Sequence, residues 1–299
     1  MMKSIEVITG NIKKNKTLRK DKIYVIEGEV HVVKGVTLTI SDQVTILLVN
    51  GVFPKSLVRR SVLIFDQGSS MSAKRFYVKA ADANHKPIKF PDNGGIWFLG
   101  NFNDSSKDRV SVKVNRKNPS SSFKADMVAA YYLGRKDSYL SIKTGKELDI
   151  GDDIDGFSVL GVGKGEWNIS EVRSHYSGDD GFDVTNSHIK LDRLEIKHPT
   201  EDGMNISSSR VEIHKSLFLD IRKTDNTDRD LFDLETDDGA SFVELYSRCW
   251  VRLDGVFGDQ VVLSSTVMPR PNVKDENEQR YAFSGQLKKA ALIYSIDQD

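Results

Sequence analysis

Short runs of alternating apolar and polar residues fill most of the chain and recur at an interval of about 22 residues. The segments WNISEVRSHYSGDDGFDVTN (167–186) and IKLDRLEIKHPTEDGMNISS (189–208) align at a shift of 22 residues, so that Trp167 falls over Ile189. Alternation with a period of two is typical of β-strands, and helical spacing does not fit these runs. A repeat of this length, with Gly, Asn and Ser at its breaks, is typical of one coil of a parallel β-helix.

Four coils share one frame, in which an aspartate is followed by glycine or leucine, an apolar residue, any residue and a second apolar residue. The four strings are DGFSV, DGFDV, DGMNI and DLFDL. Before the last string, the alignment also places Val211, Ile213 and Phe218 in apolar positions of a coil. The frame predicts one inward column, formed by Phe157, Phe182, Met204 and Phe232. Because stacked coils bury a continuous core, the sequence predicts an all-β fold, a right-handed single-stranded parallel β-helix.

The first half of the chain has the same character with a less regular repeat. Short strands are predicted at 23–26, 30–33, 38–40 and 44–49. Residues 101–126 are polar, basic and rich in Ser and Asn, which predicts an excursion from the helix.

One β-helix domain is predicted over the whole chain, residues 1–299. We expect an N-terminal cap and irregular basic coils in residues 1–150, and regular coils in 151–260. Residues 268–284 lose the frame, so a C-terminal cap is predicted in 261–299. Caps are expected because an open end of a solenoid exposes unpaired strand edges.

Composition narrows the class of protein only slightly. The formal net charge is zero, but residues 1–150 hold 26 Lys and Arg against 14 Asp and Glu, so the second half is correspondingly acidic. No apolar run approaches the ~20 residues of a membrane span, and the N-terminus has no secretory signal. The single cysteine, Cys249, excludes an intramolecular disulfide. We expect no nucleic-acid partner and an extracellular or virion-associated location, and the sequence leaves the oligomeric state open.

The repeat also stacks aspartates at the turn before each frame. It places Asp155, Asp180, Asp202 and Asp230 in one column, with Asp179 just upstream and Asp183, Asn205 and Asp233 in the outward slot that follows. Neighbouring coils lie ~4.8 Å apart, so stacked carboxylates repel each other by ~3 kcal/mol at an effective dielectric constant of about 20. Something must relieve that repulsion.

Two interpretations of the aspartates are open. Calcium takes about six to eight oxygen ligands, and the lack of histidine and cysteine in the cluster disfavours zinc. Aspartate before glycine is also ordinary turn chemistry, because the aspartate caps its own backbone and glycine tolerates a positive φ. The sequence therefore predicts either a calcium site or a ladder of structural turns.

The string GDDGFD resembles the calcium-binding aspartates of the family-nine pectate lyases, β-helix enzymes that cleave polyuronides. Asp179, Asp180 and Asp183 match the string, and Asp155 matches the aspartate one coil earlier. The resemblance covers about residues 150–235 and implies that these four aspartates bind calcium. In that family, calcium grips a uronate carboxylate and acidifies the C5 proton, a lysine removes the proton, and β-elimination breaks the glycosidic bond.

The same resemblance implies a lysine base one or two coils beyond the calcium site. Lys215 is the nearest candidate, since the repeat places it over Arg193 and Glu171. Arg193 and Lys190 are candidates for binding the carboxylates of a substrate. Alternative candidates for the base are Lys190, Arg222 and Lys223.

Three functions are compatible with these patterns. The first is binding of an acidic polysaccharide, with calcium-assisted β-elimination as a further step. The second is a non-catalytic structural or carbohydrate-binding β-helix of a cell surface or virion appendage. The third is glycoside hydrolysis by paired carboxylates such as those of Asp179, Asp180 and Asp202. No nucleophile-elbow string and no phosphate-binding loop occurs in the sequence.

Overall fold

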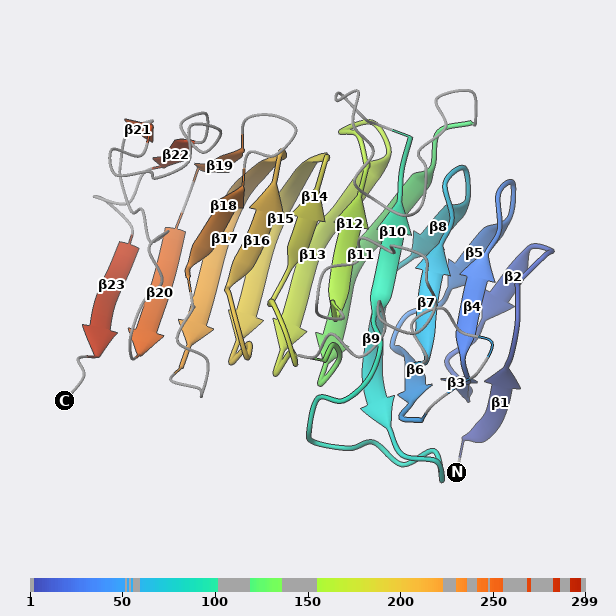
Figure 1. Cartoon of the computed structure of the whole chain (residues 1–299). Coiled ribbons are helices and arrows are strands. Elements are labelled where there is room, and N and C mark those ends of the chain that lie inside the picture. The colour runs from blue at the N-terminus through green and yellow to red at the C-terminus, as the bar shows by residue number, and fades with distance from the viewer. Residues whose placement is uncertain are drawn as a thin grey trace.

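The computed structural model describes residues 3–51, 53, 55, 60–101, 119–135, 155–222, 230–235 and 241–246, together with the backbone of four later strands. The regular elements in these residues are β-strands, and none of them is a helix long and apolar enough to span a membrane. Figure 1 shows the strands side by side in an elongated stack, with the N-terminus at one end and the C-terminal strands at the other.

The strands are β1 (Ser4–Ile8), β2 (Lys16–Leu18), β3 (Lys22–Ile26), β4 (Glu29–Val32), β5 (Thr37–Ile40), β6 (Val44–Val49), β7 (Val62–Phe65), β8 (Ser70–Ala73), β9 (Arg75–Ala81), β10 (Ile96–Leu99), β11 (Ser122–Tyr131), β12 (Phe157–Leu160), β13 (Trp167–His175), β14 (Asp183–Thr185), β15 (His188–Lys197), β16 (Met204–Ser207), β17 (Arg210–Ile221), β18 (Phe232–Glu235), β19 (Phe242–Leu245), β20 (Arg248–Asp254), β21 (Met268–Pro269), β22 (Ala282–Gly285) and β23 (Ala291–Ile296). The four short strands predicted between residues 23 and 49 correspond to β3, β4, β5 and β6, so that prediction is confirmed.

These strands form two sheets whose pairings are parallel, apart from the short antiparallel pair of β21 and β22. Sheet B has seven strands in the order β18-β16-β14-β12-β10-β7-β4. Sheet A has sixteen strands. It is divided into two parallel rows of strands, called lanes here, because β11 pairs with β8 over its first residues and with β9 over its last residues, and β17 pairs in the same way with β19 and β20. Lane A1 holds β2, β5, β8, β19 and the first halves of the long strands, and lane A2 holds β1, β3, β6, β9, β20 and the second halves.

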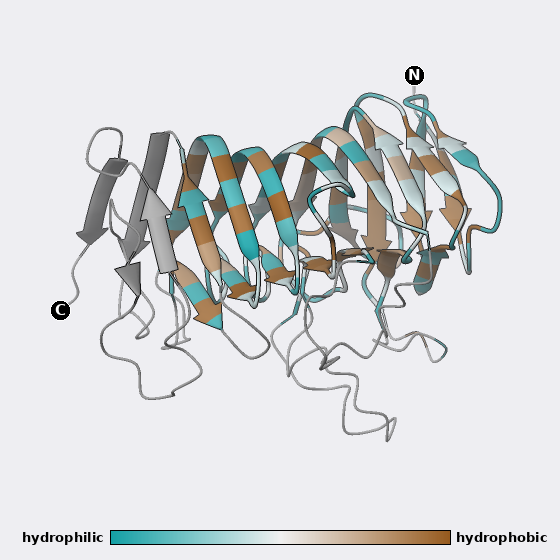
Figure 2. Ribbon diagram, turned by 90° about the horizontal axis from the view of Figure 1, so that it is seen from above, coloured by the Kyte–Doolittle hydropathy of each residue, from teal (hydrophilic) through white to brown (hydrophobic). Residues whose placement is uncertain are grey.

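Each coil therefore crosses lane A1, then lane A2, then sheet B, and the chain advances by one coil at each circuit. The long strands bend between the lanes, which Figure 2 shows as arcs over the body of the molecule. This winding is that of a right-handed parallel β-helix, and the predicted fold is confirmed.

The predicted inward column is also confirmed. Phe157, Phe182, Met204 and Phe232 are all buried, and Met204 pairs directly with Phe232. The column continues into the irregular half, where the rings of Phe65 and Phe98 stack at 5.0 Å and those of Phe98 and Phe157 at 5.6 Å. Each buried ring contributes roughly 1.5–3 kcal/mol relative to an exposed one. One apolar core thus runs through both halves of the chain.

The alignment of the third regular coil was wrong by one residue after Leu191. A β-bulge between Leu191 and Arg193 shifts the register, so that Phe218 pairs with Glu195 and not with Ile196. Because strand side chains alternate, a shift of one residue moves every side chain to the other face. Phe218 is therefore half-buried on the outside of lane A2, where the Nζ atom of Lys197 lies 4.9 Å from its ring centroid.

The predicted excursion at 101–126 is too long at its end, because β11 already begins at Ser122. Residues 102–118 lie outside the described residues, as do the residues between β20 and β21. The last strands, β22 and β23, pair in parallel with β19 and β20 in the region where a C-terminal cap was predicted. The rest of 261–299 lies outside the described residues.

A buried carboxylate fixes the points at which the chain leaves and rejoins the helix. The side chain of Glu166, only 7% exposed, accepts hydrogen bonds from the backbone N–H groups of Asn101 at 3.0 Å, Ser121 at 2.6 Å and Gly163 at 2.9 Å. Hydrogen bonds to an ionised group contribute more than neutral ones, and the bonds from Ser121 and Gly163 are buried. Glu166 thus joins three separate segments of the chain.

Replacing Glu166 is therefore expected to destabilise the fold. We expect Glu166→Ala to lower the free energy of unfolding by about 3 kcal/mol, measured by urea denaturation, because the donors lose a charged acceptor. Glu6→Gln is the control, since Glu6 forms ion pairs only at the surface with Lys16 and Lys22, and its change is expected to stay below about 1 kcal/mol. Equal losses in the two variants would contradict the role assigned to Glu166.

Candidate functional site

The aspartates gather at one corner of the coil, where lane A2 ends and sheet B begins. The predicted column is present, because the backbone N–H of Asp202 donates to Oδ1 of Asp180 at 2.9 Å, and that of Asp230 donates to Oδ1 of Asp202 at 2.5 Å. Asp155 precedes β12 as Asp180 precedes the equivalent strand β14. The carboxylates of Asp180 and Asp202 thus cap the turn of the next coil and not their own backbone. The glycines that follow the aspartates, Gly156, Gly181 and Gly203, have no positive φ, so the turns differ from the Asp-Gly turn chemistry expected from the sequence.

Three of the four predicted calcium ligands lie together. Asp155, Asp179 and Asp180 each offer a carboxylate oxygen, and these oxygens all lie within 4.8 Å of one another. Calcium binds oxygen at about 2.3–2.6 Å, so two ligands on opposite sides of the ion lie about 5 Å apart. The donor set consists only of hard oxygen atoms, and its spacing fits a calcium ion.

Asp183 lies next to this group but is not part of it. It stands in the outward slot of sheet B, paired in register with Ser158 on one side and Asn205 on the other, and Asn205 pairs in turn with Asp233. The carboxylate of Asp183 is buried and accepts a hydrogen bond from Oγ1 of Thr185 at 3.3 Å. The predicted outward row of Asp183, Asn205 and Asp233 is confirmed, and it runs along the axis of the helix beside the three grouped aspartates.

Burial and mutual repulsion disfavour the ionised form of these carboxylates. Burial is the main cause that raises the pKa of Asp180 well above its usual value, and the charge of Asp155 raises it further. The pKa values of Asp155, Asp183 and Asp202 are also raised, chiefly by burial. Within the described residues, no lysine or arginine forms an ion pair with any of these four aspartates. The corner therefore favours either protons or a bound cation.

A stack of rings shapes the turns that carry the aspartates. Tyr132, Tyr176 and His198 occupy equivalent positions at the end of lane A2, and all three have a positive φ, between 54° and 58°. The rings of Tyr132 and Tyr176 stack at 4.7 Å, and those of Tyr176 and His198 at 5.0 Å. A left-handed conformation is unfavourable for such residues, so the stacking helps to hold it. The 22-residue spacing of Tyr176 and His198 was a signal for this feature that the prediction did not use.

An arginine that the sequence did not single out lies in the coil next to Asp179. The N–H of Gly178 donates to the carbonyl of Leu133 at 2.8 Å, so the parallel register places Arg135 beside Asp179. Nε of Arg135 lies 3.2 Å from Oδ1 of Asp92. A long insertion follows Arg135 and breaks the repeat, which is why its position was not predictable.

The three basic residues predicted for the site lie elsewhere on the coil. Lys215 stands between the two lanes, exposed, with its Nζ 2.8 Å from Oδ2 of Asp192. Six residues of strand separate it from the next turn, which is about 20 Å at the rise of a β-strand. Arg193 pairs with Glu171 and Ser216, so the predicted stacking of Lys215 over Arg193 was wrong by the same one-residue bulge.

Lys190 points outward from lane A1, where it pairs in register with Glu212. The structure thus does not bring Lys190, Arg193 or Lys215 to the aspartate corner. Of the alternative bases, Arg222 forms an ion pair with Asp220 at 3.1 Å at the end of lane A2. Lys223 lies outside the described residues.

The raised pKa values predict an unusual dependence of stability on pH. With divalent cations removed, the folded chain holds protons that the unfolded chain loses above the usual aspartate pKa of 3.8, so stability is expected to fall as the pH rises from about 5 to 8. Asp180→Asn removes one of these groups, so the variant is expected to melt several degrees above the wild type near pH 8 in chelator, with a flatter pH profile.

Comparing the melting profiles of wild type and Asp180→Asn separates the effect of Asp180 from that of His31, which also titrates in this range. Burial lowers the pKa of His31, but the hydrogen bonds that its ring donates to Asp66 and Glu29 outweigh burial and raise the pKa to about 9. The stabilisation that His31 supplies is therefore also lost as the pH rises. His31 contributes equally to wild type and variant. Parallel melting profiles of the two proteins would show that Asp180 does not titrate in this way.

A model of one protein family matches residues 10–208, which is about two thirds of the chain. That family is described as the pectate-lyase like beta helix domain. Nothing matches among the curated proteins or among the solved structures. The match spans the N-terminal coils, the inner column as far as Met204 and the corner that holds Asp155, Asp179 and Asp180, and the chain belongs to the family of pectate-lyase-like β-helix domains.

Proposed function

We propose that this β-helix binds an acidic polysaccharide through a calcium ion held by Asp155, Asp179 and Asp180. The observation that carries the proposal is the convergence of three carboxylate oxygens within 4.8 Å at a largely buried corner. Such a group is costly unless its charge is neutralised, and a divalent cation neutralises it while the carboxylates stay ionised. Membership of the pectate-lyase-like family supports a carbohydrate as the ligand.

Calcium fits this corner better than magnesium or zinc. Magnesium requires near-ideal octahedral geometry and gives up its water reluctantly, whereas calcium tolerates an irregular set of carboxylate, carbonyl and water ligands. Zinc prefers nitrogen and sulfur ligands, and the group contains neither histidine nor cysteine. The remaining positions around the ion would be open to water and to the ligand.

A polymer of uronic acids has the chemistry that completes such a site. When bound, calcium supplies a positive charge that attracts a uronate carboxylate and acidifies the neighbouring C5 proton. The guanidinium of Arg135 belongs to the adjacent coil, and arginine suits the planar carboxylate of a second sugar residue. The aspartates hold the cation, and Arg135 extends the positively charged contact along the helix axis.

The aspartate corner is assigned the binding of the polysaccharide and not its cleavage. Elimination also needs a base within hydrogen-bond reach of the C5 proton, and Lys215 lies about 20 Å of strand away from the nearest aspartate turn. A catalytic role for Lys215, Arg193 or Lys190 would require a second site on the lanes of sheet A.

Calcium is expected to stabilise the protein. A free concentration of calcium about 100-fold above its Kd adds about 2.7 kcal/mol to the free energy of unfolding, which for a chain of this size raises Tm by several degrees. Magnesium at the same concentration is expected to have a smaller effect. Differential scanning calorimetry with and without a chelator measures both.

Asp179→Asn tests the ligand group in the same experiment. The variant is expected to lose most of the calcium-dependent rise in Tm, because it removes one of three charged ligands. Asp192→Asn is the matched control, since Asp192 lies between the lanes beside Lys215 and away from the corner. If Asp192→Asn abolishes the rise, or Asp179→Asn leaves it intact, the calcium ion is not held by this group.

Binding of polygalacturonate or alginate is expected to require calcium and to be lost in Asp179→Asn, as measured by affinity electrophoresis. Ultraviolet absorbance of the unsaturated product, followed in the same mixtures, tests for elimination. A calcium-dependent rise in Tm without retention by any polyuronide would show that the cluster is structural, and the polysaccharide proposal would fail.

A further inference from the structure

The first coil of the β-helix has a free edge on all three sides. β1 pairs only with β3, β2 pairs only with β5, and between them Ile12 forms a bridge to Val32. No other strand or helix of the described residues lies on the opposite side of this coil. Half of its backbone N–H and C=O groups therefore point away from the molecule at the N-terminal end.

This edge carries exposed apolar side chains. Ile5 and Val7 on β1 are 52% and 43% exposed, and they account for two of the five large hydrophobic side chains that are exposed in the described residues. In the next two coils, Val25 pairs with Val7 and Leu47 pairs with Val25, so these residues continue the same outward column. Val25 and Leu47 are both buried. The apolar outer surface of lane A2 is thus covered in the inner coils and open at β1.

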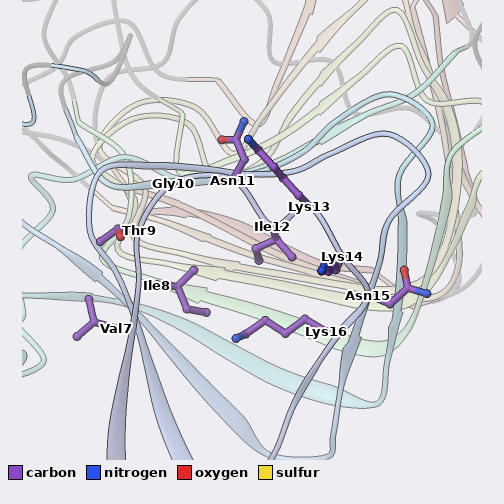
Figure 3. A pocket seen from close by; sticks show the side chains of 10 residues that line it. All are labelled: Val7, Ile8, Thr9, Gly10, Asn11, Ile12, Lys13, Lys14, Asn15 and Lys16. Carbon is purple, nitrogen blue, oxygen red and sulfur yellow. The ribbon is translucent and has the colours of Figure 1, made fainter.

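A basic pocket lies where β1 ends. It is shallow, has a volume of about 520 Å³, and is lined by residues 7–16, from the end of β1 to the start of β2. Figure 3 shows Ile8 and Ile12 toward the middle of the pocket, with the side chains of Lys13, Lys14 and Lys16 around them. None of the lining residues is acidic. Lys16 forms an ion pair with Glu6 at 2.7 Å, whereas Lys13 and Lys14 have no ion pair in the described part of the chain.

Charge and hydrogen bonding together select one kind of occupant. Residues 1–22 hold seven Lys and Arg against two acidic residues, so the same end of a second copy would be repelled. An acidic polysaccharide satisfies the lysines but has no alternating N–H and C=O groups to match the edge of β1. A β-strand with acidic residues satisfies the backbone edge, the apolar side chains and the lysines at once.

We propose that the N-terminal end of this β-helix is a docking surface for an extended, acidic peptide strand of a partner protein. The strand pairs in parallel with the free edge of β1 and packs apolar side chains against Ile5 and Val7. Beyond Ile8 it enters the basic pocket, where its carboxylates lie close to Lys13 and Lys14. The docked strand takes the place of the next coil of the solenoid.

The test uses two fluorescent peptides and the full chain. The first peptide is Thr-Val-Thr-Val-Thr-Glu-Glu-Glu, and the second carries Lys-Lys-Lys at its C-terminal end. Fluorescence anisotropy is expected to show binding of the acidic peptide only. Hydrogen exchange of the complex is expected to slow at the amides of β1 and to stay unchanged at β23.

The double variant Lys13→Glu/Lys14→Glu is expected to weaken binding of the acidic peptide at least tenfold. Lys124→Glu is the matched control on the outer face of β11, and it should change the affinity less than twofold. The calorimetric Tm of each variant reports whether the fold is intact.

Two results would overturn the proposal. Binding without protection of the β1 amides would show that the lysines attract the peptide only by charge. Polygalacturonate that displaces the peptide from wild type, and that binds Lys13→Glu/Lys14→Glu poorly, would identify the end as a surface for anionic polymers.

Discussion

The structure depends on parallel coils that stack in register, about 4.8 Å apart. Stacking makes each residue the neighbour of its own equivalent in the next coil. For apolar residues this is favourable at every step, as in the column that runs from Phe65 through Phe98 and Phe157 to Phe232. For charged residues it is unfavourable, because like charges meet at short distance unless something separates them.

The molecule handles acidic residues in two different ways. On the outer face of lane A2, Glu195 accepts hydrogen bonds from His175 at 3.1 Å and from Lys197, and these contacts lower its pKa to about 2 in spite of burial. At the corner beside sheet B, Asp155, Asp180 and Asp202 stack without such partners among the described residues, and their pKa values rise. The same coils therefore compensate acidic charge on one side and leave it uncompensated on another. This contrast, more than the number of aspartates, makes the corner a candidate for a cation.

Stacking also has a consequence at the ends of the helix. Inner coils pair on both sides, whereas the first coil pairs on one side only among the described residues, so its strands carry backbone groups without a strand partner. Lysines around such an edge are a common protection against pairing with a second copy. Here they surround a pocket with an apolar floor of Ile8 and Ile12, which makes the protected edge selective for an acidic strand.

The sequence by itself determined the periodic part of this protein. The 22-residue frame was enough to predict the coils, the inner column and the stacked aspartates, because each depends on what recurs at one spacing. What does not recur was decided by the tertiary structure. One bulge after Leu191 moved Phe218 to the outside and separated Lys215 from Arg193, since an extra residue in one strand changes the face of all that follow. The place of Arg135 in the coil next to Asp179 depends on the register across an insertion, and the edge of β1 depends on which of the described strands pair with it, so neither follows from the repeat.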